Sequence, residues 1–196
     1  MPIRETQFVP GCYYHLYNRG AGRRTIFTNS GDYLVFLRRL KEHVATLHVA
    51  VIAYCLMPNH YHLLVRQDGE IAAGKLAQLV SNGYAQWFNR RYEHAGTLFE
   101  ARYKSLHVSQ DEYVRHLCRY IHLNPVRHGF ADHPSEWIYS NYLEWIGQRP
   151  GTLVDRAFVA AWFPRPNAYE EFVASRYAKA DDLPGPLGDY FVSLER

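Results

Sequence analysis

A tight turn between two apolar stretches constrains this chain more than any other feature. Residues 49–56 are almost continuously apolar, which is typical of a strand that is covered on both faces. Pro58 and Asn59 follow shortly after, and these residue types suit the second and third positions of a β-turn. From His60 to Val65 the side chains then alternate as they do in a strand. The two stretches are therefore predicted to form the arms of a β-hairpin.

The second arm of this hairpin carries two imidazoles. A strand has a period of two, so His60 and His62 share one face, about 7 Å apart at the backbone. Tyr61 and Leu63 point the other way, toward a cover of helices. Two neutral imidazoles so placed can hold one divalent metal. A bare His-x-His motif also fits two half-buried histidines in a strand, so the motif alone does not decide.

Two further strands and two helices surround the hairpin. Residues 12–17 and the second half of 97–108 are predicted strands. Apolar side chains at helical spacing predict helices over residues 33–47 and 74–92. The order strand, helix, strand, strand, helix, strand predicts an α+β fold, a ferredoxin-like antiparallel sheet with helices on one face. The other face would be free, and both histidines would point there.

A third helix is expected after the last strand and is predicted to stop at Leu123 or Asn124, because Pro125 disfavours helical structure in the residue before it. Tyr120 and Asn124 are four residues apart and thus lie on one face. The amide oxygen of Asn124 is a hard ligand that suits magnesium or manganese. A tyrosine beside such a metal can attack a phosphate as a covalent nucleophile. Taken alone, Tyr120 fits a packing residue better, because aromatic residues at helical spacing usually belong to the core.

Charge is spread unevenly along the chain. Residues 1–128 carry 16 Lys and Arg against 9 Asp and Glu, a net +7, whereas residues 129–196 carry 6 against 10, a net −4. A basic body indicates a polyanionic partner, although an ordinary mixed surface fits the same counts. With no apolar run of 18 residues and no signal-peptide region, we expect no membrane partner. Three cysteines without a Cys-x-x-Cys pair indicate free thiols in the cytoplasm.

Several motifs, in order and spacing over roughly residues 10–147, resemble the HUH single-tyrosine transposases, most closely their REP-associated tyrosine transposase branch. Separate motifs in register are far more specific than one His-x-His. The matching segments are Met57-Pro58-Asn59-His60-Tyr61-His62, Tyr120-Ile121-His122-Leu123-Asn124-Pro125-Val126-Arg127, Tyr14-His15-Leu16-Tyr17-Asn18-Arg19-Gly20, Arg102-Tyr103-Lys104-Ser105 and Tyr139-Ser140-Asn141-Tyr142-Leu143-Glu144-Trp145-Ile146-Gly147.

The resemblance implies a metal-dependent single-stranded DNA endonuclease and strand transferase. Members bind DNA hairpins from repetitive extragenic palindromes with guide bases beside them, and their tyrosine becomes joined to a 5′ phosphate while a 3′-hydroxyl leaves. It implies His60 and His62 as ligands of Mg²⁺ or Mn²⁺, with Tyr120 as the nucleophile. Asn124 falls where the family's third, helix-borne ligand lies. Such a protein is expected at the nucleoid, as a monomer or homodimer.

Cations near these motifs have two expected roles. The metal together with Arg119, His116 or Arg127 would favour the ionised form of Tyr120, and His116 alone is expected to be a surface residue. Phosphate contacts position DNA without reading its sequence. The residues expected to make them are Arg19, Arg102, Lys104 and Arg127.

Residues 1–130 are predicted to form the catalytic domain, and residues 131–196 a short helical C-terminal extension packed on it. We expect this acidic extension to lie near the active site and to limit access or dimerisation. Two other functions remain open from the sequence. One is a catalytically silent regulator that binds hairpin DNA with the same fold. The other is a histidine-metal hydrolase that uses water as its nucleophile.

Overall fold

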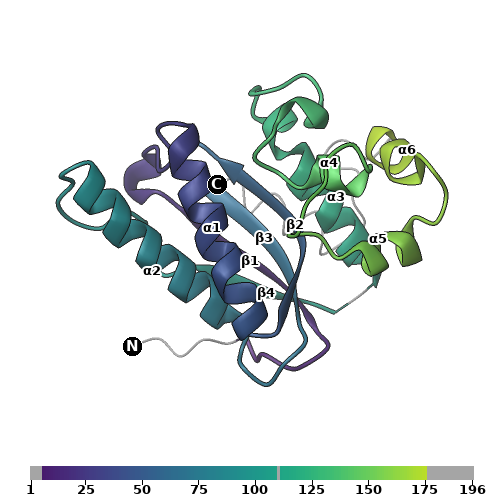
Figure 1. Ribbon diagram of the computed structural model, residues 1–196, viewed down its shortest axis with the longest axis horizontal. Helices are drawn as coiled ribbons and strands as arrows, with labels where there is room; N and C mark the ends of the chain where they lie inside the picture. The colour runs from purple at the N-terminus through teal and green to yellow at the C-terminus, as the bar shows by residue number, and fades with distance from the viewer. Residues whose placement is uncertain (1–5, 110, 176–196) are drawn as a thin grey trace.

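A computed structural model describes residues 6–109 and 111–175 of the chain (Figure 1). Two helices are interspersed among the four strands of the sheet, and the last strand is followed by helices alone. In chain order the elements are β1 (Tyr13–Arg19), η1 (Ala21–Arg23), α1 (Ser30–Thr46), β2 (Val49–Met57), β3 (His60–Gln67), α2 (Gly74–Arg91), β4 (Lys104–Val108), α3 (Asp111–Arg127), η2 (Pro134–Glu136), α4 (Tyr142–Trp145), α5 (Arg156–Trp162) and α6 (Ala168–Ala174).

The four strands form one antiparallel sheet in the order β2-β3-β1-β4. β2 and β3 are the arms of the predicted hairpin, and Met57 pairs with His60 across the two-residue turn. β1 lies between β3 and β4, so strands that are distant in the sequence become neighbours. This is the ferredoxin-like arrangement, and the predicted α+β class with a helical C-terminal region is confirmed.

The helices α1 and α2 cover one face of the sheet (Figure 1). Strand alternation decides which side chains they cover: Tyr61 and Leu63 from β3, and Tyr14 and Leu16 from β1, are all fully buried in this core. The hydroxyl of Tyr61 also hydrogen bonds the hydroxyl of Ser81 on α2 at 2.7 Å. Because successive side chains of a strand point to opposite faces, the two histidines of β3 are directed away from this core.

The second face is not free, so that part of the sequence prediction is wrong. α3 lies across it, chiefly over β2. Val114, Leu117 and Ile121 form the apolar stripe of this helix and pack with Ile52 and Cys55 of β2, and each of the five is at most 1% exposed. An apolar helix face left in water would forgo this burial, which explains why α3 closes over the sheet. The histidines of β3 consequently face a helix rather than open solvent.

α3 continues through Pro125 for two more residues, so the predicted stop at Leu123 or Asn124 is wrong. Proline removes one backbone donor from a helix, which is tolerated here within the last turn. The backbone N–H of His128 still donates to the carbonyl of Asn124 at 3.1 Å, so the turn closes. Asn124 therefore lies within the helix, one turn after Tyr120 and on the same face.

One buried asparagine attaches the C-terminal helices to the edge of the sheet. The Asn141 Oδ1 atom accepts from the backbone N–H of Tyr54 at 2.8 Å and from the His122 ring at 2.9 Å. Its Nδ2 donates to the carbonyl of Ile52 at 2.9 Å, and Trp145 donates to the same carbonyl at 3.0 Å. These bonds connect β2, α3 and α4 in one buried network.

The predicted division of the chain at residue 130 stays a prediction. The role of the predicted acidic extension at the active site is likewise still a prediction, and its last residues, 176–196, lie outside the described residues. In the part of the chain that the structure describes, no helix is both long and apolar enough to span a membrane.

Candidate active site

The hairpin turn sets both the position and the orientation of His60. Its Nδ1 atom lies 2.7 Å from the Oδ1 atom of Asn59, the residue before it. The Asn59 amide is oriented by its Nδ2 group, which donates to the backbone carbonyl of Arg23 at 3.3 Å. On the other side of the ring, His60 Nε2 lies 3.0 Å from the Oδ1 atom of Asn124 on α3. The imidazole is thus held between two amide oxygens.

His60 cannot satisfy both of these oxygens as a neutral ring. Burial lowers the pKa of His60 to about 4, so it is neutral at pH 7 and carries a single N–H. One of its two contacts therefore joins two acceptors. The contact between Nε2 and the Asn124 oxygen is the one beside His62 and Tyr120, and a cation there would be attracted by both lone pairs.

The ring of His62 contacts a second histidine, which was not singled out from the sequence. The Nδ1 atom of His62 lies 3.0 Å from Nε2 of His15 on β1, and both rings are almost completely buried. Burial lowers the pKa of His15 to about 3 and that of His62 well below its usual value. One neutral ring donates and the other accepts. With His62 Nδ1 as the donor, its Nε2 lone pair is left for a ligand.

Strand alternation places the side chain of His15 on the other face of β1 from those of Tyr14 and Leu16, and this pattern was visible in the sequence. His15 lies near His62 because β1 pairs with β3. In this pairing Tyr17 stands opposite His62. The two rings and that of Tyr17 stack together, with centroids 5.0 to 5.9 Å apart. Local sequence patterns do not show which strand lies beside β3, because this is decided by the tertiary structure.

The donor set of His60, His62 and Asn124 fits a divalent cation by three observations. Adjacent ligands of an octahedral cation at about 2.1 Å are about 3.0 Å apart, which is the separation of His60 Nε2 and Asn124 Oδ1. Asn124 is fully buried, and its Nδ2 atom has no hydrogen-bond partner. Such an orphaned donor indicates that the amide is oriented by its oxygen rather than its nitrogen. The third observation is that all three donors are uncharged.

An uncharged donor set also has a chemical consequence. Within the described residues, no three His, Cys, Asp or Glu side chains are grouped so as to hold a metal. The His60, His62 and Asn124 donors therefore leave the full charge of a divalent cation uncompensated by the protein. A phosphodiester would supply that compensation, because it brings negatively charged oxygen ligands of the kind that Mg²⁺ prefers. The donor set therefore suits a metal whose remaining positions are taken by phosphate oxygens.

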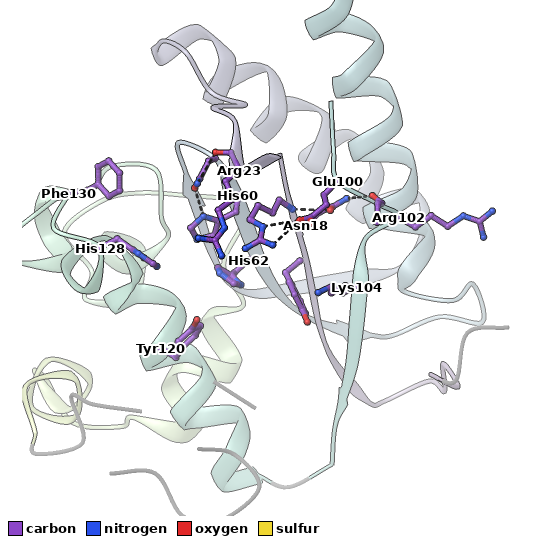
Figure 2. A pocket seen from close by; sticks show the side chains of 14 residues that line it. Asn18, Arg23, His60, His62, Glu100, Arg102, Lys104, Tyr120, His128 and Phe130 are labelled. Carbon is purple, nitrogen blue, oxygen red and sulfur yellow. Dashed lines mark hydrogen bonds and ion pairs between the residues drawn. The ribbon is translucent and has the colours of Figure 1, made fainter. Parts of the chain in front are cut away.

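Tyr120 faces these histidines from α3. Its ring centroid lies 5.7 Å from that of His62 in an edge-on contact, and Figure 2 shows its hydroxyl directed toward the histidines. The guanidinium of Arg127 lies over the Tyr120 ring, 5.1 Å from its centroid. A cation over the ring face attracts the ring electrons and restrains the side chain. Tyr120 is 4% exposed, so its accessible surface is confined to the pocket side.

The other two groups proposed to act on Tyr120 point elsewhere. Arg119 is 2% exposed and donates to the backbone carbonyl of Phe172 and to the hydroxyl of Ser175 near α6. It also lies 3.0 Å from His116, whose ring is 6% exposed, so the expectation of a surface histidine is wrong. Arg127 is therefore the cation that the fold places against the tyrosine.

A pocket of about 390 Å³, here called the histidine pocket, lies at the meeting point of these elements (Figure 2). His60, His62 and Tyr120 line it, whereas Asn124 is buried behind His60 and does not. The ring of His128, 5.5 Å from that of His60, and the half-exposed ring of Phe130 also reach the pocket, and neither was predicted. Both follow the end of α3, where no local pattern marks them.

Most of the predicted phosphate contacts surround this pocket. Arg19, Arg102 and Lys104 line it, and Arg127 does not, because it lies over the tyrosine ring instead. Arg19 forms an ion pair with Glu100 at 2.9 Å on the rim. Arg23 is a further cation of the lining. Glu100 is the single acidic side chain among the lining residues, so the pocket is basic overall.

A ferredoxin-like sheet whose hairpin histidines face a helix-borne tyrosine is the arrangement of a single-tyrosine transposase. The chain belongs to the IS200-like transposases: the family described as Transposase IS200 like matches residues 8–124, more than half of the chain. The matched residues include His60, His62, Tyr120 and Asn124. The family resemblance predicted from the sequence is confirmed.

Two individual similarities are to REP-associated tyrosine transposases. A protein of Haemophilus influenzae assigned as a REP-associated tyrosine transposase is 26% identical over 102 residues, which are 46% of this chain and 57% of that relative. The match thus spans little more than half of the relative's length. A solved structure of a REP-associated tyrosine transposase bound to a REP hairpin is 17% identical and superposes with a TM-score of 0.63. It covers 79% of this chain and 94% of its own, which shows that the fold is shared.

Proposed function

We propose that this chain is a metal-dependent single-stranded DNA endonuclease and strand transferase that acts through a 5′-phosphotyrosine. Membership of the transposase family supports the reaction class. The observation that carries the proposal is the convergence of two neutral imidazoles and a tyrosine on one basic pocket. Each group suits one part of phosphoryl transfer, and packing alone would not require them together.

The proposed substrate is a DNA hairpin of the REP type, flanked by unpaired guide bases. Cations around the histidine pocket suit a nucleic-acid backbone. The solved relative is described as bound to a REP hairpin, which supports this choice of substrate.

In the proposed reaction the Tyr120 oxygen attacks the scissile phosphorus. A bond forms between phosphorus and the tyrosine oxygen, and the bond from phosphorus to the 3′ oxygen of the preceding nucleotide breaks. The tyrosine loses a proton and the leaving 3′ oxygen gains one, so the products are a 5′-phosphotyrosine and a free 3′-hydroxyl. Arg127 holds the tyrosine ring and favours its ionised form through its positive charge.

His60, His62 and Asn124 would hold Mg²⁺ or Mn²⁺ beside this tyrosine. When bound, the metal polarises a phosphate oxygen and stabilises the charge that develops there. The residues behind the ligands have orienting roles. Asn59 fixes the ring of His60 through Nδ1, and His15 does the same for His62.

A covalent-trapping experiment tests the proposal. The wild-type protein and Tyr120→Phe are incubated with labelled single-stranded hairpin DNA from the flank of the gene, with Mn²⁺ or with a chelator, and separated on a denaturing gel. We expect a shifted protein–DNA band from the wild type that requires the metal. In Tyr120→Phe the band should be absent, because the phenylalanine ring has no oxygen to form the bond. Tyr113→Phe, on the same helix but outside the pocket, should form the band normally.

The remaining outcomes separate the alternative functions. Metal-dependent cleavage without a band, equal in wild type and Tyr120→Phe, would instead identify a hydrolase that uses water. Tight hairpin binding without cleavage or band, across several flanking sequences, would identify a silent regulator.

A further inference from the structure

A second groove adjoins the histidine pocket and has no part in the chemistry described above. It has a volume of about 880 Å³ and runs between α2 and the segment 96–103. Four carboxamides of α2 line it: Asn89, which donates a hydrogen bond to the carbonyl of Gly96 at 3.0 Å, and three others, Gln78, Asn82 and Gln86. We call it the amide groove.

The three carboxamides form a regular row. They are spaced four residues apart, so they follow one another along a single face of α2. All three side chains are exposed, and none makes a hydrogen bond to another part of the chain that the structure describes. Their donors and acceptors are therefore available to a ligand over about three turns of helix.

The groove is poor in charge. Its one carboxylate is that of Glu100, which is engaged by Arg19, and its one cation is Arg102. The lining on the segment 96–103 also includes Leu98 and Phe99, which are 1% and 8% exposed. A phosphate backbone is bound by cations, so this lining does not suit phosphates. It suits nucleobases, whose edges pair with the donor and acceptor of a carboxamide and whose faces are apolar.

The amide groove continues directly from the histidine pocket. Asn18, Glu100, Ala101 and Arg102 line both, so the two hollows meet at this segment. Figure 2 shows the Arg102 side chain extending away from His60, past the Asn18 side of the pocket. A DNA strand whose phosphate group lies at the histidines can run past Arg102, so that its next bases lie against α2.

We propose that the amide groove binds unpaired nucleobases of the strand next to the scissile phosphate, and that its carboxamide row reads their edges. This rests on the proposed function and adds a base-reading site to it. The phosphates would stay with the cations of the histidine pocket, and the bases would supply the contacts along α2.

Binding to matched tails tests this inference. Hairpins carry a six-nucleotide unpaired tail at the 5′ or the 3′ end, made either with bases or with abasic nucleotides, and a tail-less hairpin is the reference. Affinity is measured by fluorescence anisotropy in the presence of a chelator, so that no cleavage is required. For the wild type we expect base-bearing tails at one end to bind at least about fivefold more tightly than abasic tails, as expected from one good carboxamide–base pair.

The triple variant Gln78→Ala, Asn82→Ala, Gln86→Ala should bind both kinds of tail equally and keep its affinity for the tail-less hairpin. Alanine is the best helix former, so α2 should be retained. The variant Asn82→Asp keeps the shape and removes one donor, and it should lose part of the base-dependent gain. Gln148→Ala removes an exposed carboxamide outside both hollows and should match the wild type.

A triple variant that keeps the full base-dependent gain at both ends would overturn the inference, while the covalent band of Tyr120 could still form. A wild type without any base-dependent gain would overturn it as well. A chain that bound neither tailed nor tail-less DNA would overturn the proposed function and this inference together.

Discussion

The two faces of strand β3 place neighbouring residues in opposite surroundings. Tyr61 and Leu63 are enclosed by α1 and α2 in a core of apolar side chains. His60 and His62 face α3 and make their contacts through nitrogen atoms, to Asn124 and to His15. On one face, burial of apolar side chains stabilises the fold. On the other, burial lowers the pKa of the two imidazoles, so they stay neutral.

This difference shows how a small domain holds a polar site without a separate lobe. The packed face contributes stability that does not depend on the site. On the other face each buried nitrogen needs a partner, since an unpaired buried polar group is costly. The partners come from three elements, β1, the hairpin turn and α3. We therefore expect substitutions on the two faces to separate chemistry from stability.

The largest expected effect is on the site face. His62→Leu keeps the approximate volume of the side chain but removes a proposed metal ligand. The yield of covalent adduct should fall about a thousandfold, since the electrophilic contribution of a metal is several kcal/mol. Stability should fall by about 1–3 kcal/mol, because the His15 nitrogen loses its partner. Adduct yield and urea unfolding measure the two quantities, and an unchanged adduct yield would contradict the assigned role.

The adjacent residue supplies the matching test of the packed face. Leu63→Ala removes a fully buried side chain from the core under α1 and α2. The free energy of unfolding should fall by about 2–5 kcal/mol, measured by urea denaturation. The adduct yield per folded molecule should be unchanged. A parallel loss of chemistry at a temperature where the variant is folded would show that the two faces are not independent.

A smaller effect is expected behind the ligands. His15→Phe fills the same space but cannot accept a hydrogen bond from His62. Affinity for Mn²⁺, measured by calorimetry without DNA, should fall about 10- to 100-fold, the usual cost of losing a residue that orients a metal ligand. His15→Gln offers an acceptor again and should recover part of the affinity. His107→Gln, an exposed histidine on β4, is the control and should bind as the wild type does.

The smallest effect is expected at the rim of the site face. Lys104→Ala removes one cation from the histidine pocket without touching the proposed ligands. The slope of log affinity for single-stranded DNA against log salt should decrease in magnitude by about 0.7, the value for one phosphate contact. Lys75→Ala, an exposed lysine of α2 outside both hollows, should leave the slope unchanged. Equal slopes in all three proteins would exclude a phosphate contact by Lys104.

Local patterns were sufficient for much of the fold. Period-two alternation assigned Tyr61 and Leu63 to the core and His60 and His62 to the other face, and the structure confirms this assignment. The same pattern carried no information on the strand beside β3, so His15 was missed. The stop predicted before Pro125 was wrong because the last turn of α3 tolerates a proline, which a local propensity does not take into account.

The sequence by itself determined the hairpin, the order of strands and helices, and the family, because these depend on local periodicity and on motifs in register. Only the tertiary structure decided that α3 closes over β2, that Arg127 rather than Arg119 lies against Tyr120, and that His15 stands behind His62. The physical reason is that these contacts join segments far apart in the chain. Their formation is governed by the burial of apolar surface and the pairing of buried polar groups across the whole molecule.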